Sequence, residues 1–554
     1  MKIKQEKAME TKKIVALTIN SMEKVYPDSN EFECEKEGTM LCNERFHFQL
    51  ALRNISQDVL YGVYIKAEGK LGKYLELRVV RNVPCEMAAF SASDNYYERK
   101  VSGLYPDILQ PWDEKGLILP ANGNWKSVWI TIDGKGLNLS TGRYDIPLTI
   151  LGTTGEILGR CVYVLEICPG KLVKNDYIIT HWMHYDGIAA RNKVKLFSKK
   201  FYKVFDSYLK LYVQSGNTML LTPLFTPPLD TKPGEERRTA QLVGVHNKNG
   251  KYVFDFSELE KFIEFAREHG IKYFEFSHLF TQWGGEFCPK IMAETEVGEQ
   301  RIFGWEKRAD SETYKAFLEV FLPALMKFVR SKGLEEYCFV HLTDEPGARH
   351  IEQYLRCKNM VKKYIGNMRI MDALSDYEFY EKKGVEVPAV VTPEAENFLS
   401  HGVKDMLIYY CSYPSDRFYS NRFLGMPSQR NRIIGIQLYL AGVRGFLHWG
   451  FNFYNSGLSL FELNPYMEPD GGGFFPGGDS FVVYPSENGA IASLRLEVFY
   501  DGIQDCLALR ALEKKKGRDF VVKLIQTEGV YGMNVYPRSA KWHKMFRDKV
   551  NRLL

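Results

Sequence analysis

The sequence predicts two domains of different class: an N-terminal antiparallel β-sandwich over residues 1–170, followed by a (β/α)8 barrel of the TIM type over residues 171–488. A short helical extension over residues 489–554 is expected to pack on the barrel. Before about residue 170, short runs of alternating apolar residues are separated by turn signals, which is typical of a sandwich. After about residue 175, β-rich runs alternate with helical stretches, which is typical of an α/β barrel.

The sandwich is predicted from strands with a period of two. Apolar residues alternate along Phe46–Leu52, so one face of that strand is expected to be buried. Tyr144–Ile150 and Cys161–Leu165 read as a closing strand pair joined by the Gly-rich turn Gly152–Gly155. Nothing in this region indicates a chemical reaction.

The barrel is predicted from eight short β-rich runs with helices between them. A doubly wound open sheet is the alternative, but it needs a Gly-rich phosphate loop after its first strand, and His181–Gly187 is not such a loop. The tail contributes an amphipathic helix at Ile491–Gly517. The predicted strands are Tyr177–Trp182, Met219–Thr222, Lys272–Ser277, Cys338–Thr343, Met368–Asp372, Val387–Val391, Met406–Tyr410 and Val443–Trp449, and the clearest helices are Ser257–His269, Ser311–Lys332, Ala348–Tyr364 and Ser428–Ala441.

Composition excludes several classes of protein. The 73 Lys and Arg against 68 Asp and Glu give a net charge of +5 without a basic stripe, which argues against a nucleic-acid partner. The 33 Tyr, 35 Phe and 8 Trp argue against disorder. No apolar run reaches the length of a membrane span, and the first residues do not resemble a signal peptide. Ten scattered cysteines without a CxxC pair indicate free thiols and a cytoplasmic location. An oligomer is possible.

Aromatic and hydrogen-bonding residues recur at the ends of the predicted barrel strands, where the reactive groups of such barrels lie. Flat apolar rings suit the C–H faces of a sugar, and His, Asp and Asn suit its hydroxyls, so a glycan or glycoconjugate substrate is expected. Scaffold roles are the alternative for each residue; His278 could be a core histidine and Asp372 could cap the next segment. The predicted substrate-binding residues are Trp182, His184, His278, Trp283, Asp372, Tyr410, Tyr413, Trp449 and Asn452.

The adjacent carboxylates Asp344 and Glu345 are the candidates for catalysis. They follow the fourth predicted strand and precede Pro346. Like charges at short range separate two pKa values, so one carboxyl can stay protonated as an acid while its neighbour stays ionised. The alternative is an acidic start to the helix Ala348–Tyr364, which would complement the helix dipole. Their position after a barrel strand favours catalysis.

The end of the seventh predicted strand bears on the mechanism. It reads Tyr409–Ser412 and contains no acid, although a direct carboxylate nucleophile is commonly placed there in barrel glycosidases. Its lack favours substrate assistance, in which the 2-acetamido oxygen of the sugar is the nucleophile. One carboxylate then polarises the amide, and the other protonates the leaving oxygen and activates water. The alternative is a glycosidase that uses Asp372 or Asp376 as nucleophile on a sugar without an acetamido group.

Three sequence motifs that follow a predicted β-sandwich along the chain together resemble glycoside hydrolase family 123: Thr343–Pro346, Ser277–Gly284 and Gly445–Trp449. The resemblance extends over almost the whole chain. It implies a retaining β-N-acetylgalactosaminidase that works by substrate assistance. By the Asp-Glu motif, it implies that Asp344 orients and polarises the acetamido group and that Glu345 is the general acid/base.

The remaining polar motifs receive weaker interpretations. His181 and His184 lie close to Asp186 in the sequence, but we expect the two histidines to contact the sugar or a carboxylate rather than to bind a metal. We expect no cofactor. The Gly-rich stretch 470–479 follows the last barrel strand and is either a lid over the sugar or a surface connection. A noncatalytic carbohydrate-binding protein is the rival class, and the retained acid pair argues against it.

Overall fold

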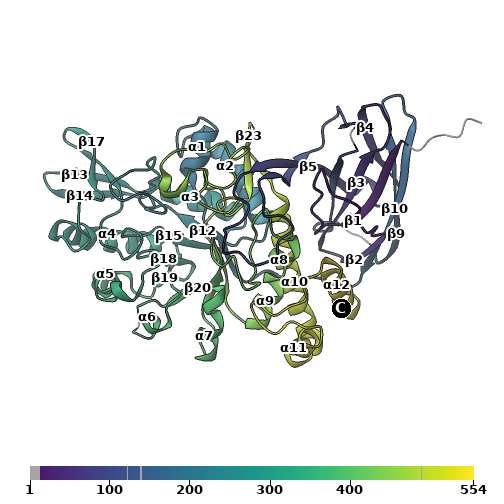
Figure 1. The fold of residues 1–554 in the computed structure, drawn as a ribbon. Helices are drawn as coiled ribbons and strands as arrows, with labels where there is room; N and C mark the ends of the chain where they lie inside the picture. The colour runs from purple at the N-terminus through teal and green to yellow at the C-terminus, as the bar shows by residue number, and fades with distance from the viewer. Residues whose placement is uncertain (1–12, 122, 138–139, 383, 488) are drawn as a thin grey trace, which may run out of the picture.

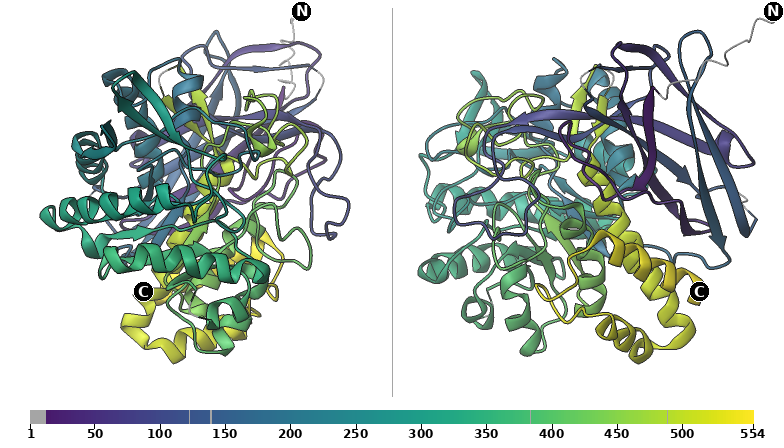
Figure 2. Two further views of the ribbon diagram at one scale, coloured as in Figure 1. Left: turned by 90° about the vertical axis from the view of Figure 1, so that its left-hand side faces the viewer. Right: turned by 45° about the vertical axis from the view of Figure 1, so that its right-hand side comes forward.

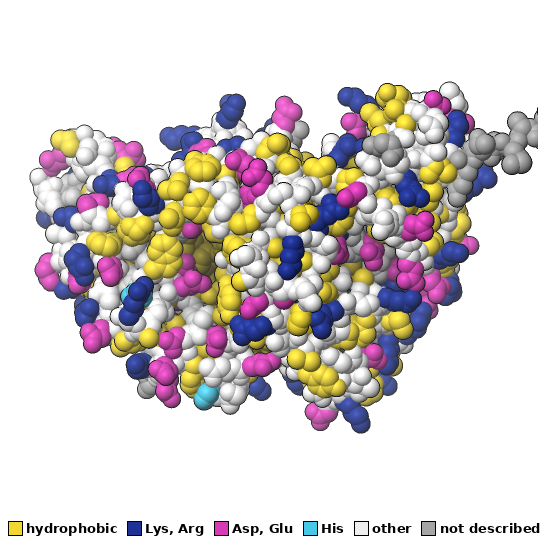
Figure 3. Space-filling view, in the orientation of Figure 1, with side chains coloured by type: hydrophobic (Ala, Val, Ile, Leu, Met, Phe, Trp, Pro, Cys, Tyr) yellow, Lys and Arg dark blue, Asp and Glu magenta, His cyan; other side chains and the backbone are white. Residues whose placement is uncertain are grey.

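The computed structural model describes residues 13–554 except 122, 138–139, 383 and 488. A β-rich N-terminal region lies beside a larger barrel, at the right and the left of Figure 1 respectively. Acidic and basic side chains are interspersed over the face shown in Figure 3, in keeping with the small net charge. Among the described helices, none has the length and apolar character needed to cross a membrane.

The N-terminal region consists of two five-stranded sheets that share one hydrophobic core. Phe48 and Leu50 of one sheet and Ile146 and Leu148 of the other are fully buried in that core. Pairing is antiparallel except between β2 and β10, which run parallel, so the prediction of a purely antiparallel sandwich misses one pair. One sheet has the order β1 (Ile14–Asn20), β3 (Arg45–Asn54), β8 (Trp125–Asp133), β5 (Leu75–Cys85) and β6 (Gly103–Pro111), and the other β2 (Glu37–Leu41), β10 (Ile157–Cys168), β9 (Gly142–Leu151), β4 (Leu60–Ala67) and β7 (Leu117–Leu119).

Eight parallel strands form a nearly closed barrel, and each predicted strand overlaps one of them. The end strands β11 and β12 meet where the Thr218 amide donates to the Ile179 carbonyl oxygen at 2.9 Å. Their order is β11 (Ile178–His181), β22 (Gly445–His448), β21 (Leu407–Tyr409), β20 (Val387–Val391), β19 (Arg369–Ala373), β18 (Cys338–Val340), β15 (Tyr273–Phe276) and β12 (Met219–Thr222).

Helices surround this barrel, and two hairpins extend from its loops at the upper left of Figure 1. The hairpins are β13 (Gly244–Lys248) with β14 (Lys251–Asp255) and β16 (Ile291–Thr295) with β17 (Gly298–Phe303). The helices are α1 (Tyr185–Arg191), α2 (Lys199–Gln214), α3 (Ser257–Glu268), α4 (Glu312–Ser331), α5 (Ile351–Ile365), α6 (Tyr377–Glu381), α7 (Ala395–Ser400), α8 (Ser428–Arg432) and α9 (Ile434–Ala441).

The C-terminal helices are α10 (Leu494–Lys516), α11 (Arg518–Thr527) and α12 (Ala540–Leu553), with the short strands β23 (Val483–Ser486) and β24 (Gly489–Ala492) before them. Helix α10 is buried on all sides over most of its length, so the prediction that it is amphipathic is wrong. The reason is its position between barrel and sandwich: Arg495 pairs with Asp107 of β6 at 2.8 Å, and its carbonyl oxygen accepts from Asn431 of α8.

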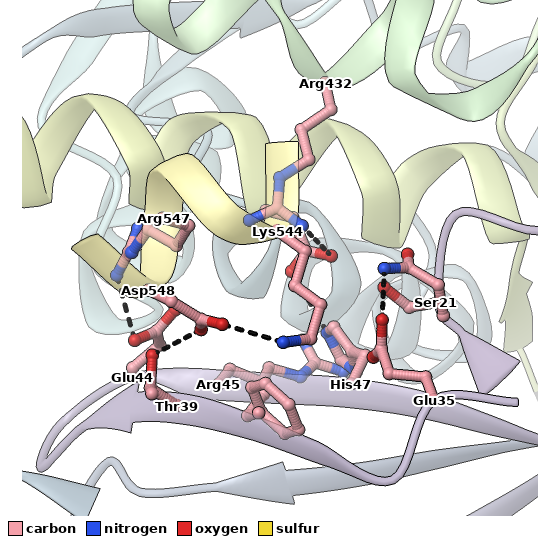
Figure 4. Close-up of a pocket in the computed structure, with 14 residues that line it drawn as sticks. Ser21, Glu35, Thr39, Glu44, Arg45, His47, Arg432, Lys544, Arg547 and Asp548 are labelled. Carbon is pink, nitrogen blue, oxygen red and sulfur yellow. Dashed lines mark hydrogen bonds and ion pairs between the residues drawn. The ribbon is translucent and has the colours of Figure 1, made fainter. Parts of the chain in front are cut away.

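Sandwich strands lie next to the C-terminal helices (Figure 2), and charged side chains join the two domains there (Figure 4). Arg547 of α12 pairs with Glu44 at 2.9 Å, and Arg45 of β3 pairs with Glu497 of α10 at 2.9 Å. The Thr39 hydroxyl donates to Asp548 at 2.7 Å. A small cavity of about 40 Å³ lies among these groups, but the charges around it neutralise one another. The cluster therefore holds the domains together.

Candidate active site

A cavity of about 220 Å³ opens at the carboxyl ends of the barrel strands. Each of its walls comes from a different strand end, as expected for the reactive face of a barrel. It combines three carboxylates with five large aromatic side chains, a composition suited to a sugar. The lining residues are Trp182, Leu229, Asp230, Gln282, Trp283, Asp344, Glu345, Ala373, Tyr409, Cys411, Ser412, Leu447, Trp449 and Phe475.

The predicted acid pair lies together in this cavity. Asp344 is half-buried and Glu345 is exposed, so the two carboxyls meet different surroundings. The carbonyl oxygen of Asp344 accepts from the Trp283 amide at 2.8 Å, which connects the segment after β18 to the segment after β15. Trp283 itself is 41% exposed at the cavity. One half-buried and one exposed carboxyl can therefore serve different roles.

Three of the ten non-glycine residues with a left-handed backbone in the described chain line this cavity. Glu345 has φ of +43°, Trp283 of +58° and Asp230 of +40°, and all three line the cavity. A left-handed backbone costs free energy for a residue other than glycine, and it persists where surrounding structure enforces it. Active sites often contain residues held in such conformations, so the three positions agree with a functional role for this cavity.

Tyr409, the last residue of β21, holds Glu345. Its hydroxyl donates to Glu345 Oε1 at 2.6 Å and lies 3.4 Å from Ser375 Oγ. Burial and the neighbouring Glu345 raise the pKa of Tyr409 well above its ordinary value, so the hydroxyl keeps its proton and remains a donor. A short bond of this kind fixes the carboxylate in one orientation.

Burial and the charge of Glu345 raise the pKa of Asp344 well above its ordinary value. The third carboxylate, Asp230, has its pKa raised to about 6 by burial, an effect that Arg237 partly opposes. Its Oδ2 accepts from the Leu458 amide at 3.0 Å. Asp344 and Asp230 thus hold their protons more strongly than in water, and shifted pKa values of this kind are typical of functional sites.

A buried chain of charged groups lies below Asp344, inside the barrel. His341 Nε2 is 3.0 Å from Glu275 Oε2, and its Nδ1 is 3.2 Å from Asp372 Oδ1. Burial alone would lower the pKa of His341, but the bonds to Asp372 and Glu275 raise it to about 9. The Tyr354 hydroxyl donates to Asp372 Oδ2 at 2.6 Å, so both oxygens of that carboxylate are occupied.

A metal ion fits these residues poorly. One ligand atom each of His278, His341 and Asp372 lie within 4.8 Å of one another. Both ring nitrogens of His341 are already engaged by carboxylates, however, and the His278 ring stacks on it at 4.4 Å and 21°. Lone pairs in nearly parallel ring planes do not converge on one point. The arrangement suits an imidazolium held between two acids.

The structure brings Trp182, Trp283 and Trp449 into the cavity with the acid pair, and places the other predicted binding residues outside its lining. The His184 ring contacts the Trp449 carbonyl oxygen at 2.9 Å, and Asn452 exchanges two 2.9 Å hydrogen bonds with the His184 backbone. Both residues are buried behind Trp449 and support it.

The two predicted tyrosines also lie outside the lining. The Tyr410 hydroxyl donates to Asn431 at 3.0 Å, on the helix side of β21. Tyr413 is 45% exposed and accepts from Arg417 at 2.8 Å. His278 and Asp372 belong to the buried chain below the cavity, and Asp376 caps α6 by accepting from the Phe379 amide.

Sequence reasoning missed several lining residues, of which Tyr409 is the most informative. Strand alternation could have found it: Leu407 and Tyr409 pack in the barrel interior, whereas Ile408 and Tyr410 pack against helices. Asp230, Gln282, Ser412 and Phe475 lie in loops without a periodic signal. The Gly-rich stretch 470–479 contributes Phe475, which packs on Trp449 at 5.1 Å.

Comparison with known proteins places this site in a family. The profile of the glycoside hydrolase 123 catalytic domain matches residues 182–512, more than half of the chain. The chain belongs to glycoside hydrolase family 123. The matched range of this family 123 chain includes the cavity, Asp344 and Glu345, and runs through most of α10. The predicted resemblance is therefore confirmed, and the chain is a glycoside hydrolase.

A solved structure supports the same fold for the whole family 123 chain. A family 123 glycoside hydrolase from Clostridium perfringens, described in terms of glycolipid glycan hydrolysis, superposes with a TM-score of 0.74 at 16% identity, covering 98% of this chain and 97% of that one. An endo-beta-1,4-mannanase from Thermotoga petrophila gives a TM-score of only 0.33 at 13% identity, covering 60% of this chain and 77% of that one, and carries no weight. No curated protein matches significantly.

Proposed function

We propose that the protein is a retaining β-N-acetylhexosaminidase, with N-acetylgalactosamine as the preferred terminal sugar, that uses the substrate's acetamido oxygen as nucleophile. The observation that carries the proposal is the adjacent pair Asp344 and Glu345 in one strained, aromatic-lined cavity. In the described structure, β21 ends in Tyr409, a hydrogen-bond donor to Glu345, and not in a carboxylate that could act as the nucleophile.

The two carboxyls divide the work according to their surroundings. Glu345, exposed at the mouth and oriented by Tyr409, protonates the glycosidic oxygen and then removes a proton from water. Asp344, half-buried, accepts the amide N–H of the acetamido group once ionised and stabilises the positive charge of the cyclic oxazolinium-like intermediate. Because the first displacement is made by the sugar's own amide and the second by water, the anomeric configuration is retained.

The rival mechanism has less structural support. A direct nucleophile must reach the anomeric carbon, but Asp372 is fully buried with both oxygens hydrogen-bonded, and Asp376 is occupied as a helix cap. Asp230 lines the cavity, and it accepts a backbone hydrogen bond from Leu458. The acid pair is accordingly assigned the chemistry.

The aromatic side chains support a sugar as the occupant. Trp449 is fixed by a 3.1 Å hydrogen bond from its Nε1 to Asp479 Oδ2 and by packing on Phe475, so its ring is held rigid at the cavity wall. Trp182 closes the floor edge-on to His278 and His341. A rigid aromatic wall offers a stacking surface for the C–H face of a pyranose at low entropic cost.

The natural substrate is proposed to be a glycan or glycoconjugate carrying this sugar at its end. Trp283, half-exposed at the mouth beside the acid pair, is available to the group that leaves. All ten cysteines are unpaired, and on that basis we propose that the protein acts in the reducing cytoplasm.

Hydrolysis of nitrophenyl β-GalNAc, β-GlcNAc and β-Gal, each with and without GalNAc-thiazoline, tests the function. Cleavage of β-GalNAc that the thiazoline blocks is the expected result, because the thiazoline mimics the cyclised intermediate. Preference for β-GlcNAc would correct the sugar but keep the mechanism. Cleavage of β-Gal that the thiazoline leaves untouched would contradict the proposal.

A further inference from the structure

Two loops form the wall of the cavity that faces away from the acid pair's strand. The loop 411–427, which follows β21, contributes Cys411 and Ser412, and the Gly-rich loop 470–479 contributes Phe475. Neither loop belongs to a regular element, so its position must be set by contacts from outside it. The C-terminal region supplies some of those contacts, as where Arg495 of α10 donates to the Gly478 carbonyl oxygen and Tyr536 donates to the Phe418 carbonyl oxygen. Others come from the N-terminal sandwich domain, through residues 86–99 between β5 and β6, here called the bridging segment, and through Lys24.

The bridging segment binds the Gly-rich loop by backbone and carboxylate. Asp470 Oδ2 accepts from the amides of Glu86 and Met87 at 3.2 and 3.0 Å, and the Gly477 amide donates to the Met87 carbonyl oxygen at 2.7 Å. A Cβ atom added to Gly477 would lie 2.3 Å from Cys85 Sγ. The Gly-rich loop and the bridging segment therefore cross at a distance that only glycine allows.

The same segment crosses the loop 411–427 equally closely. The amides of Glu98 and Arg99 donate to the Gly425 carbonyl oxygen at 2.9 and 3.3 Å. A Cβ atom on Gly425 would lie 2.2 Å from the Arg99 carbonyl oxygen. Two glycines, one in each wall loop, thus meet the one bridging segment.

Two charged residues of the sandwich domain strengthen the second crossing. The buried Lys24 ammonium donates to the carbonyl oxygens of Leu424 and Met426 at 2.7 and 2.6 Å. Asp94 accepts from the Phe418 amide at 2.7 Å and pairs with the fully buried Arg430 at 2.8 Å.

A short path connects these contacts to the cavity. Asn421, between the Phe418 and Leu424 contacts, donates from Nδ2 to the carbonyl oxygens of Cys411 and Pro414, both at 2.8 Å. The lining residue Ser412 lies between those two carbonyls. In the other loop, the Phe475 amide donates to the carbonyl oxygen of Asp470, the residue that the bridging segment binds.

We propose that the sandwich domain completes the active site, in that Lys24, Asp94 and the bridging segment hold both wall loops and thereby position Ser412 and Phe475 against the bound sugar. Lys24 and Asp94 are positioning residues, since they act through the loops and not on the substrate. The inference rests on the cavity being the glycosidase site of the proposed function, and it needs no particular sugar.

The test uses the full chain with Lys24→Met, which keeps the apolar stem and removes the ammonium, and with Asp470→Ala in the other loop. Asp28→Asn is the matched control, because it removes an exposed 2.7 Å ion pair to the Arg99 side chain of the bridging segment rather than a bond to either loop. Hydrogen exchange of the free protein is measured first, followed by kinetics on whichever aryl glycoside the wild type hydrolyses.

Faster exchange confined to 411–427 for Lys24→Met and to 470–479 for Asp470→Ala is expected, with wild-type exchange for Asp28→Asn. Misplaced walls should raise KM about tenfold while kcat changes by less than about threefold, and the shape of the pH profile should stay that of wild type. Wild-type KM in both variants would overturn the proposal, as would exchange that rises evenly over the barrel. Inactivity of the wild type on every sugar would contradict the proposed function alone, since exchange needs no substrate.

Discussion

Replacing Tyr409 with phenylalanine removes one oxygen atom from the wall of the cavity and leaves the ring in place. That oxygen donates to Glu345 Oε1 at 2.6 Å. A hydrogen bond to an ionised group contributes about 1.5–3 kcal/mol, and a factor of ten in rate corresponds to about 1.4 kcal/mol. If the bond is needed to hold the general acid in place, Tyr409→Phe should lower kcat/KM about 10- to 150-fold.

Tyr410→Phe is the matched control for this change. The neighbouring hydroxyl donates to buried Asn431 at 3.0 Å, on the opposite face of β21. Its removal should cost about 1 kcal/mol in the free energy of unfolding and leave kcat/KM within about twofold of wild type. Steady-state kinetics on an aryl glycoside and urea unfolding followed by circular dichroism measure both quantities. Equal losses of activity in the two variants, or none in Tyr409→Phe, would refute the reasoning.

Three further predictions concern the acid pair and the groups below it. Glu345→Gln should reduce turnover of substrates with poor leaving groups by about 10²–10⁴-fold and of nitrophenyl glycosides much less, and equal losses on both would remove Glu345 from the acid role. Asp344→Asn should weaken thiazoline binding, which an inhibition constant measures. The same change should raise the free energy of unfolding by about 1 kcal/mol at neutral pH, because the folded state raises the pKa of this carboxyl and so penalises its ionised form; calorimetry measures this gain. Hydrogen bonds raise the pKa of His341 from 6.5 to about 9 against the effect of burial. The contribution of His341 to the stability of the folded state should therefore be complete below pH 6.5 and be lost as the pH rises through about 9. An unfolding free energy that stays flat over that range would argue against the imidazolium.

The barrel was predictable because its strands are buried on both faces and its helices carry a regular apolar stripe. All eight predicted strands occur, and the acid pair follows the fourth of them. Periodicity does not reveal which residues of a strand face the barrel interior. Tyr409 and Tyr410 are adjacent residues of the same type, and the structure places Tyr409 in the interior and Tyr410 against the helices. Helix α10 shows the same limit, since burial between two domains requires no polar face.

The loop part of the site lay beyond sequence reasoning for a different reason. Asp230, Ser412 and Phe475 reach the cavity because of contacts far along the chain, such as that between Asp470 and residues 86–87. Loops follow no period that a single sequence displays. Gly425 and Gly477 were visible as glycines, but the crossings that require them depend on the domain arrangement.

The central claim, that the substrate's acetamido oxygen is the nucleophile, is tested most directly by varying that group. Aryl β-GalNAc substrates in which the acetyl carries none, one, two or three fluorine atoms have a progressively less nucleophilic carbonyl oxygen. The account predicts that log kcat/KM falls steeply and linearly along this series, with Asp344→Asn flattening the slope. A rate that does not depend on fluorination would contradict it, and would mean that a protein group or a water molecule attacks the anomeric carbon instead.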